Sequence, residues 1–119
     1  MLMIIYCYNK CSTCKKALKF LDDNNIKYEL IDIKECNPNI DILKEIKNKA
    51  NVDINKLFNT SGLIYKELEL SKKLSNLTDD EKYNLLASNG MLVKRPILIE
   101  NDFALLGFKE EIWKNKLGL

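Results

Sequence analysis

The sequence predicts an α/β fold of one domain, in which a helical insert separates a strand–helix–strand unit from a strand–strand–helix unit. An apolar run near the start gives way to residues with a helical period and then to an alternating segment. Helical periods fill the middle of the chain, and two short apolar runs around an Asn-Asp pair precede a last helical stretch. The length of 119 residues is that of a single domain, which we assign to 1–119 with the insert at about 40–90.

The first part of the chain predicts a strand, a helix and a second strand. The run Leu2–Tyr8 is typical of a strand that is buried on both faces of a sheet. From Cys14 onward the apolar residues recur at helical spacing, so a helix follows, and Ser12 or Thr13 can cap it. Ile26–Ile33 alternates and predicts the second strand. Together these segments form a βαβ unit whose first turn carries a cysteine pair.

The middle of the chain is predicted to be helical, and the end returns to strands. Amphipathic stretches lie around 42–46, 52–58 and 65–68. Thr78 and Glu81 have the spacing of a capping box, so a helix begins there, and Gly90 is expected to end it. The remaining predicted elements are a strand at 97–100 that Pro96 opens, a hairpin turn at 101–102, a strand at 103–106 and a helix at 109–117.

Composition excludes several classes of function. The net charge of +2 is too small to favour nucleic acid or an anionic membrane as a direct partner. The apolar run at the start is too short for a membrane span or a signal peptide, so the expected compartment is the cytoplasm. The chain has no histidine, which excludes Ser-His-Asp and Cys-His mechanisms and histidine-ligated metals. Of the 19 basic residues 18 are lysine, and Arg95 is the single arginine.

The four cysteines, at positions 7, 11, 14 and 36, are the main chemical feature of the sequence. A cytosolic chain keeps its thiols reduced, so a framework of structural disulfides is not expected. The first three have the C-x3-C-x2-C spacing of radical S-adenosylmethionine enzymes, but those enzymes need a large partial barrel that 119 residues cannot build. Zinc would require a second close pair, so we expect no metal site. We interpret Cys7 as a small buried apolar residue and Cys36 as a loop thiol.

Cys11 and Cys14 form a C-x-x-C pair with the placement of a redox motif. Cys11 lies at the start of the predicted helix, where unpaired backbone N–H groups, the positive helix end and Lys10 stabilise a thiolate. Cys14 lies one turn later on the apolar face, so we expect it to be more buried and to keep a pKa above the ordinary thiol value. We expect Cys11 to attack and Cys14 to displace the adduct. The alternative is that two unreactive cysteines have this spacing by accident.

Arg95 and Pro96 form a second candidate constellation. An X-Pro bond at the entrance to a strand can be cis, although the trans form stays open. Folds that carry a redox C-x-x-C after the first strand commonly place a cis-proline beside the thiols. Arginine binds oxyanions with a planar fork that lysine lacks, so Arg95 is a candidate ligand for an anionic substrate.

Four blocks of the sequence resemble the arsenate reductase (ArsC) family, in the glutaredoxin-linked branch that also contains the Spx regulators and the YffB-like proteins. The blocks are IYCYNKCSTCKKAL at 5–18, FNTSGLIYKEL at 58–68, GMLVKRP at 90–96 and GFKEEIW at 107–113. The resemblance covers essentially the whole chain. It implies a thioredoxin-like, glutaredoxin-type fold with a βαβ–ββα core and an inserted helical region.

The resemblance also implies roles for individual residues. The first cysteine is the nucleophile in the arsenate reductases, and Cys11 matches it. Those enzymes surround the oxyanion with three arginines, of which this sequence keeps Arg95. Asn59 stands at the first arginine position and Gly107-Phe108 at the third. Cys14 supplies a second cysteine that the arsenate reductases of this branch usually lack.

Arsenate is therefore expected to be a poor substrate despite the resemblance. Lys94 and Lys109 lie next to the arginine positions, and they supply charge without the planar fork.

From these observations we predict a small cytosolic thiol–disulfide oxidoreductase, most similar to the YffB-like group. Cys11 and Cys14 are the expected catalytic residues, and the expected substrate-binding residues are Lys10, Asn59, Arg95 and Pro96. No bound cofactor is expected, and glutathione, glutaredoxin or thioredoxin is the expected partner and electron donor. Two alternatives stay open. One is a true arsenate reductase, and the other is an Spx-like redox-sensing regulator that binds the α subunit of RNA polymerase, although Spx proteins carry a basic C-terminal extension and this sequence stops at Leu119.

Overall fold

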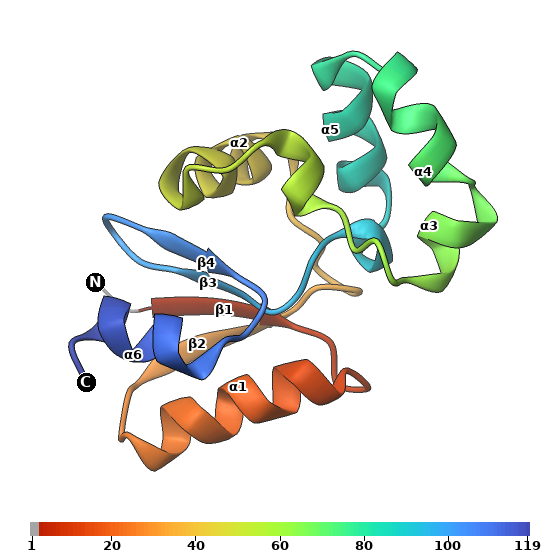
Figure 1. The fold of residues 1–119 in the computed structure, drawn as a ribbon. Helices are drawn as coiled ribbons and strands as arrows, with labels where there is room; N and C mark the ends of the chain where they lie inside the picture. Colours follow the sequence, from red (N-terminus) through yellow and green to blue (C-terminus); the bar gives the residue numbers. More distant parts are fainter. Residues whose placement is uncertain (1–2) are drawn as a thin grey trace.

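A computed structural model describes residues 3–119, which form a four-stranded sheet with helices on both faces (Figure 1). The strands are β1 (Met3–Cys7), β2 (Tyr28–Asp32), β3 (Ile97–Ile99) and β4 (Ala104–Leu106). In the order β2-β1-β3-β4, β1 is parallel to β2 and antiparallel to β3, and β3 is antiparallel to β4. This topology confirms the predicted βαβ and ββα units. Leu2, the expected first residue of the first strand, lies outside the described residues.

The helices follow the predicted order, and the structure adds short helical elements that the sequence did not predict. They are α1 (Ser12–Asp23), α2 (Ile40–Ala50), α3 (Leu63–Glu67), α4 (Leu70–Lys73), α5 (Asp79–Ser88) and α6 (Glu110–Leu117), with 3-10 turns η1 (Ile54–Leu57), η2 (Leu74–Asn76) and η3 (Gly90–Leu92). The sequence pattern did not predict α4, η2 and η3. None of the helices in the described part of the chain has the length and apolar character to cross a membrane.

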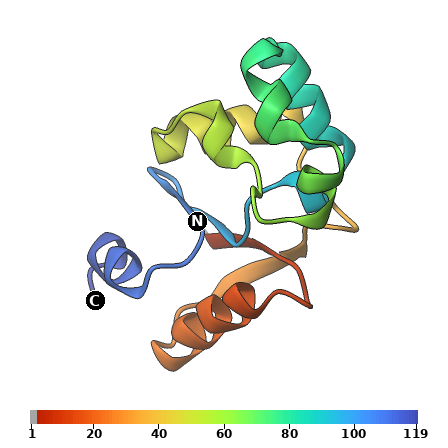
Figure 2. The ribbon, with the colours of Figure 1, turned by 45° about the vertical axis from the view of Figure 1, so that its right-hand side comes forward.

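The pleat of the sheet divides its side chains between two cores. Along β1, Tyr6 points to the face that is covered by the helical insert, which includes α2. Ile5 and Cys7 point to the opposite face, which is covered by α1 and α6 (Figure 2). The central strand β3 is buried on both faces, which is why its sequence is continuously apolar. Burial of each large apolar side chain contributes about 1.5–3 kcal/mol, so both layers of helices are held to the sheet by apolar packing.

The start of α5 confirms the predicted capping box, and its end corrects the expected role of Gly90. The Glu81 N–H donates to Thr78 Oγ1 at 3.2 Å, and the Thr78 N–H donates to Glu81 Oε1 at 3.0 Å. The helix ends at Ser88, and Gly90 begins η3 instead of capping α5. Glycine is required there because a Cβ atom would collide with the backbone carbonyl of Ile33.

Candidate functional site

The site is built around Cys11, at the junction of β1 and α1. A tight turn follows β1, closed by a hydrogen bond from the Cys11 N–H to the Tyr8 carbonyl at 3.0 Å. The N-cap of α1 is Cys11 itself and not Ser12 or Thr13, because its Sγ accepts the Cys14 N–H at 3.4 Å. A sulfur in this position faces the positive end of the helix, where nucleophilic cysteines are commonly found.

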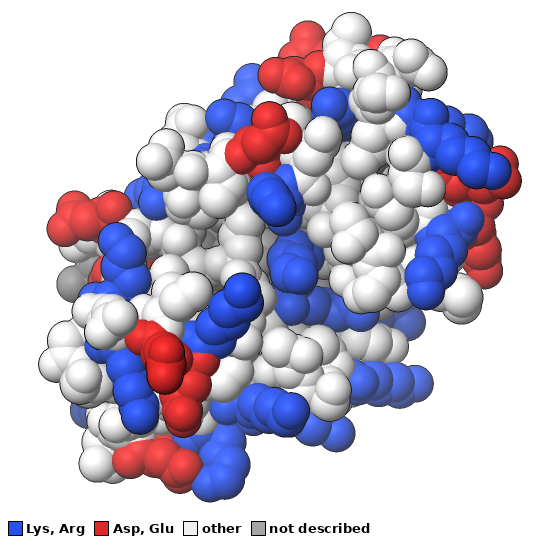
Figure 3. Space-filling model, in the orientation of Figure 1, with Lys and Arg blue, Asp and Glu red and all other residues white. Residues whose placement is uncertain are grey.

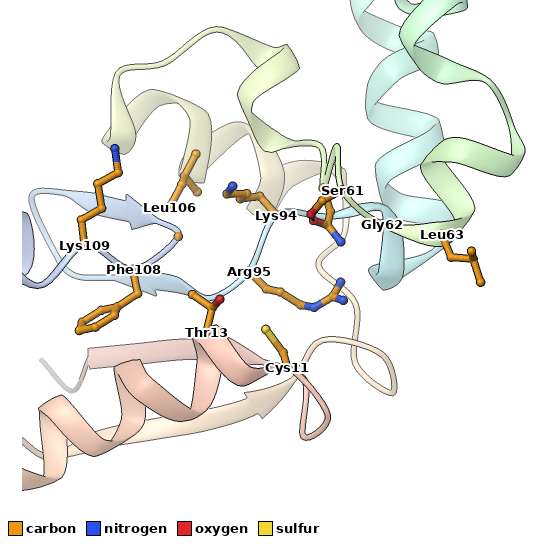
Figure 4. A pocket seen from close by; sticks show the side chains of 12 residues that line it. Cys11, Thr13, Ser61, Gly62, Leu63, Lys94, Arg95, Leu106, Phe108 and Lys109 are labelled. Carbon is orange, nitrogen blue, oxygen red and sulfur yellow. Dashed lines mark hydrogen bonds between the residues drawn. The ribbon is translucent and has the colours of Figure 1, made fainter.

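Cys11 opens into a pocket of about 480 Å³ between α1, the insert and the β4–α6 loop (Figure 4). The lining residues are Cys11, Thr13, Asn59, Ser61, Gly62, Leu63, Lys94, Arg95, Leu106, Gly107, Phe108 and Lys109. They include three cationic side chains and no carboxylate. Lys and Arg side chains accordingly gather across the middle of this face, between the insert and α1 (Figure 3). The pocket therefore has the charge of a site for an anion.

Arg95 is positioned by contacts that leave donors free for a ligand. Its Cζ lies 5.2 Å from the centre of the Tyr8 ring, and its Nη1 donates to the Met91 carbonyl at 3.5 Å. Its Nε is buried without a partner, and Arg95 forms no ion pair within residues 3–119. The Arg95–Pro96 peptide is cis, the form that the sequence left open. The guanidinium thus keeps hydrogen-bonding capacity beside the Cys11 sulfur (Figure 4).

Two segments that are distant in sequence are hydrogen-bonded to each other along one wall of the pocket. The Asn59 N–H donates to the Leu92 carbonyl at 2.8 Å, and the Lys94 N–H donates to the Leu57 carbonyl at 2.7 Å. These bonds hold the polar loop after η1 against the segment that leads into β3. Asn59 and Arg95 therefore line the same pocket as Cys11, as the resemblance implied.

The third arginine position of the resemblance is filled in a different way. The Phe108 ring packs against the rings of Phe20 and Trp113, with centroid distances of 5.6 and 4.9 Å. Gly107 adopts a left-handed conformation with φ of 71°, and a Cβ atom on it would lie 3.3 Å from Lys94 Cε. Phe108 thus helps to join α6 to α1, and a lysine side chain occupies the space beside the glycine.

Cys14 lies behind Cys11 and does not line this pocket. It is 1% exposed, which confirms the expected burial. The pKa of Cys14 is lowered, and the main cause is hydrogen bonding from the Cys7 thiol. The Tyr8 amide, the Cys11 thiol and the charge of Arg95 lower it further, whereas burial raises it. The pKa of Cys7 is raised, because that same hydrogen bond holds its proton and because it is buried. The expectation that Cys14 keeps a high pKa is therefore wrong, since burial was considered without these donors.

The other residues singled out in the sequence lie outside the pocket lining. Lys10 is exposed, and Pro96 is buried with its carbonyl accepting the Gly107 N–H at 2.8 Å. Cys36 is an exposed loop thiol, and Cys7 is buried as expected. The contact of Cys7 with Cys14 was not expected, although the alternation along β1 could have indicated that Cys7 faces α1. Residues 3–119 contain no group of three or more Cys, Asp or Glu side chains arranged to hold a metal ion.

Comparison with known proteins gives consistent matches over nearly the whole chain. The model of the ArsC family matches residues 6–115. YusI of Bacillus subtilis, an uncharacterized protein, is 42% identical over 93% of this chain and 94% of its own length. The global transcriptional regulator Spx 2 of Bacillus anthracis is 24% identical over 92% of this chain and 82% of its own length.

Two solved structures are similar in fold and sequence. An ArsC family related protein from Bacteroides fragilis has a TM-score of 0.93 and 45% identity, with 97% of each chain covered. A possible arsenate reductase from Streptococcus mutans UA159 has a TM-score of 0.85 and 39% identity, with 95% of this chain and 98% of that chain covered.

Proposed function

The chain belongs to the ArsC family and has a thioredoxin-like fold, and we propose that it is a thiol–disulfide oxidoreductase in which Cys11 attacks the substrate and Cys14 resolves the adduct. One observation carries this proposal. The Cys11 Sγ accepts a backbone N–H at the start of α1 and opens into a pocket with three cations and no carboxylate. A thiolate beside positive charge is the arrangement that nucleophilic cysteines require.

The reaction proceeds by two successive thiol–disulfide exchanges. The Cys11 thiolate attacks one sulfur of a disulfide substrate, the substrate S–S bond breaks, and one substrate thiolate leaves. Cys14 then attacks the Cys11 Sγ, the mixed disulfide breaks, and the second substrate thiolate leaves. The substrate gains two electrons, and the protein is left with a Cys11–Cys14 disulfide, which a dithiol or two thiols reduce again. The lowered pKa of Cys14 supports its role, because the thiolate is the form that attacks.

The charge of the pocket favours an anionic thiol compound such as glutathione. Glutathione carries carboxylates, and Arg95 and Lys94 offer charge-assisted hydrogen bonds to such groups. We assign glutathione, glutaredoxin or thioredoxin as the electron donor, with no resident cofactor. A cytosolic location suits this chemistry, because that compartment supplies reduced thiols.

Trapping of the mixed disulfide tests the proposal. The Cys14→Ser variant, treated with oxidised glutathione, is expected to accumulate glutathione on Cys11, because the resolving thiol is absent. Cys11→Ser should accumulate no glutathione on Cys14, which is buried, and Cys36→Ser serves as the matched control at an exposed thiol. Glutathione bound mainly at Cys36 in the Cys14→Ser variant would refute the role of Cys11.

A redox-sensing regulator is a second candidate function, favoured by the likeness to Spx 2. In this case the same cysteine pair acts as a switch, and the protein binds the α subunit of RNA polymerase. A pull-down with that subunit, on oxidised and reduced protein, separates the two functions. Capture in only one redox state without turnover favours the regulator, whereas turnover with a dithiol and no capture favours the oxidoreductase.

A further inference from the structure

A third thiol, Cys7, lies beside the proposed resolving cysteine. Side chains alternate along β1, so Cys7 shares with Ile5 the face that α1 covers. The turn that follows β1 is short and is closed by the hydrogen bond from the Cys11 N–H to the Tyr8 carbonyl. The first turn of α1 therefore lies close to the end of β1, and Cys7 and Cys14 pack in the same apolar cluster and line the same recess.

Cys7 and Cys14 are buried, yet they share a recess that is separate from the pocket of Cys11. Their exposed fractions are 5% and 1%. The recess has a volume of about 260 Å³ and lies between α1 and the edge strand β2, with Leu18 and Leu30 among its lining residues. Because this space is not filled by side chains, the two thiols can change rotamer without displacing the core. Cys36 does not line the recess.

We propose that Cys7 is a third redox-active thiol, which takes over the disulfide from Cys11. The exchange rests on the proposed function, which supplies the Cys11–Cys14 disulfide. The Cys7 sulfur loses its proton to solvent and attacks the Cys14 Sγ, so that the Cys7–Cys14 bond forms and the Cys11–Cys14 bond breaks. The bonding electron pair leaves on the Cys11 sulfur, which is free as a thiolate or takes up a proton from solvent. The exchange moves the disulfide without net oxidation or reduction.

Oxidation of Cys14 itself favours this exchange. In the reduced protein the pKa of Cys7 is raised by its hydrogen bond to Cys14, by burial and by the charges on Cys14 and Cys11. Once Cys14 and Cys11 are joined in a disulfide, neither sulfur carries a charge. Of the causes that raise the pKa of Cys7, burial then remains, so Cys7 loses its proton more readily than in the reduced protein. The product has a buried disulfide and a free Cys11 at the pocket.

Peptide mapping separates the two disulfides directly. Trypsin cleaves after Lys10 and Lys15, so Cys7 lies in peptide 1–10, whereas Cys11 and Cys14 share peptide 11–15. A Cys11–Cys14 disulfide closes a loop within peptide 11–15, and a Cys7–Cys14 disulfide joins the two peptides. The full chain with Cys36→Ser is oxidised with one equivalent of oxidised glutathione, and free thiols are alkylated under denaturing conditions at successive times.

We expect the loop within 11–15 to appear first and the joined peptides to increase at its expense, with Cys11 as the alkylated residue. Cys7→Ala should form only the loop, and Cys11→Ser, which lacks the thiol that reacts first with oxidised glutathione, should form the joined peptides far more slowly than the protein that keeps Cys11. If the loop forms while Cys7 stays fully alkylated at every time, the role of Cys7 is refuted and the proposed function stands. If the joined peptides form and the loop within 11–15 never appears, Cys11 does not pair with Cys14. This result would refute both the Cys11–Cys14 disulfide of the proposed function and its transfer to Cys7.

Discussion

Replacement of Arg95 by alanine is expected to slow the reaction with an anionic disulfide far more than with a neutral one. The Arg95 guanidinium lies at the pocket of Cys11 and forms no ion pair with any residue of 3–119. Its donors are therefore available to a substrate carboxylate. A hydrogen bond to a charged group contributes about 1.5–3 kcal/mol, so its loss lowers kcat/KM about ten- to hundredfold, at about 1.4 kcal/mol for each factor of ten.

The assay compares two substrates and two control variants. We would measure kcat/KM for oxidised glutathione, which is anionic, and for bis(hydroxyethyl) disulfide, which is neutral, with the same dithiol reductant. Arg95→Lys keeps the charge but loses the planar fork, so it should recover part of the rate with the anionic disulfide. Lys19→Ala removes an exposed charge outside the pocket lining and should change either rate by less than about twofold.

The ratio of the two losses decides the interpretation. Equal losses with both disulfides would show that Arg95 acts on the fold or on the thiols, and not on the substrate charge. An unchanged kcat/KM with both disulfides would show that Arg95 takes no part in binding the substrate.

Three further predictions follow from the same structure. Arsenate should be reduced poorly, because arginine is absent from two of the three positions that bind the oxyanion in the arsenate reductases. Each lost charge-assisted hydrogen bond costs about 1.5–3 kcal/mol, so anion binding is weaker by several kcal/mol. Efficient arsenate-dependent oxidation of glutathione and glutaredoxin would contradict this prediction. Cys7→Ala should raise the pKa of Cys14 in an ultraviolet thiolate titration, because it removes the first cause of the lowering. The pKa of Cys14 is lower in the folded state than in the unfolded state, so ionised Cys14 stabilises the wild-type fold above about pH 8.5. This stabilisation is lost as the pH falls through the folded pKa. In Cys7→Ala the pH-dependent loss of stability should be smaller. Thr78→Ala should lower the free energy of unfolding by about 1 kcal/mol in urea, and Thr60→Ala, at an exposed turn, should not.

The strands and the start of α5 were predictable because their signals are local. A continuous apolar run indicated β3, and the Thr78–Glu81 box indicated the start of α5. By contrast, α4 begins after Glu69, which adopts a left-handed conformation with φ of 52°. A non-glycine residue in that conformation gives no turn signal in the sequence, so this helix was missed.

The site was predictable where it depended on sequence position and unpredictable where it depended on packing. Asn59 and Arg95 meet at the pocket of Cys11 as the resemblance implied. The lowered pKa of Cys14 depends on the Cys7 thiol from β1, and the tight turn between β1 and α1 brings the first turn of α1 close to that thiol. Spacing within the C-x-x-C pair carries no information about that neighbour.

Residue-resolved alkylation of the reduced wild-type protein tests most directly whether Cys11 is the nucleophile. Exposure alone would place Cys36 first, because Cys36 is exposed and Cys11 is only partly so. We predict that iodoacetamide at neutral pH labels Cys11 before Cys36, because the Cys11 Sγ accepts the Cys14 N–H and opens into a cationic pocket. Labelling of Cys36 or Cys14 before Cys11 would contradict the account.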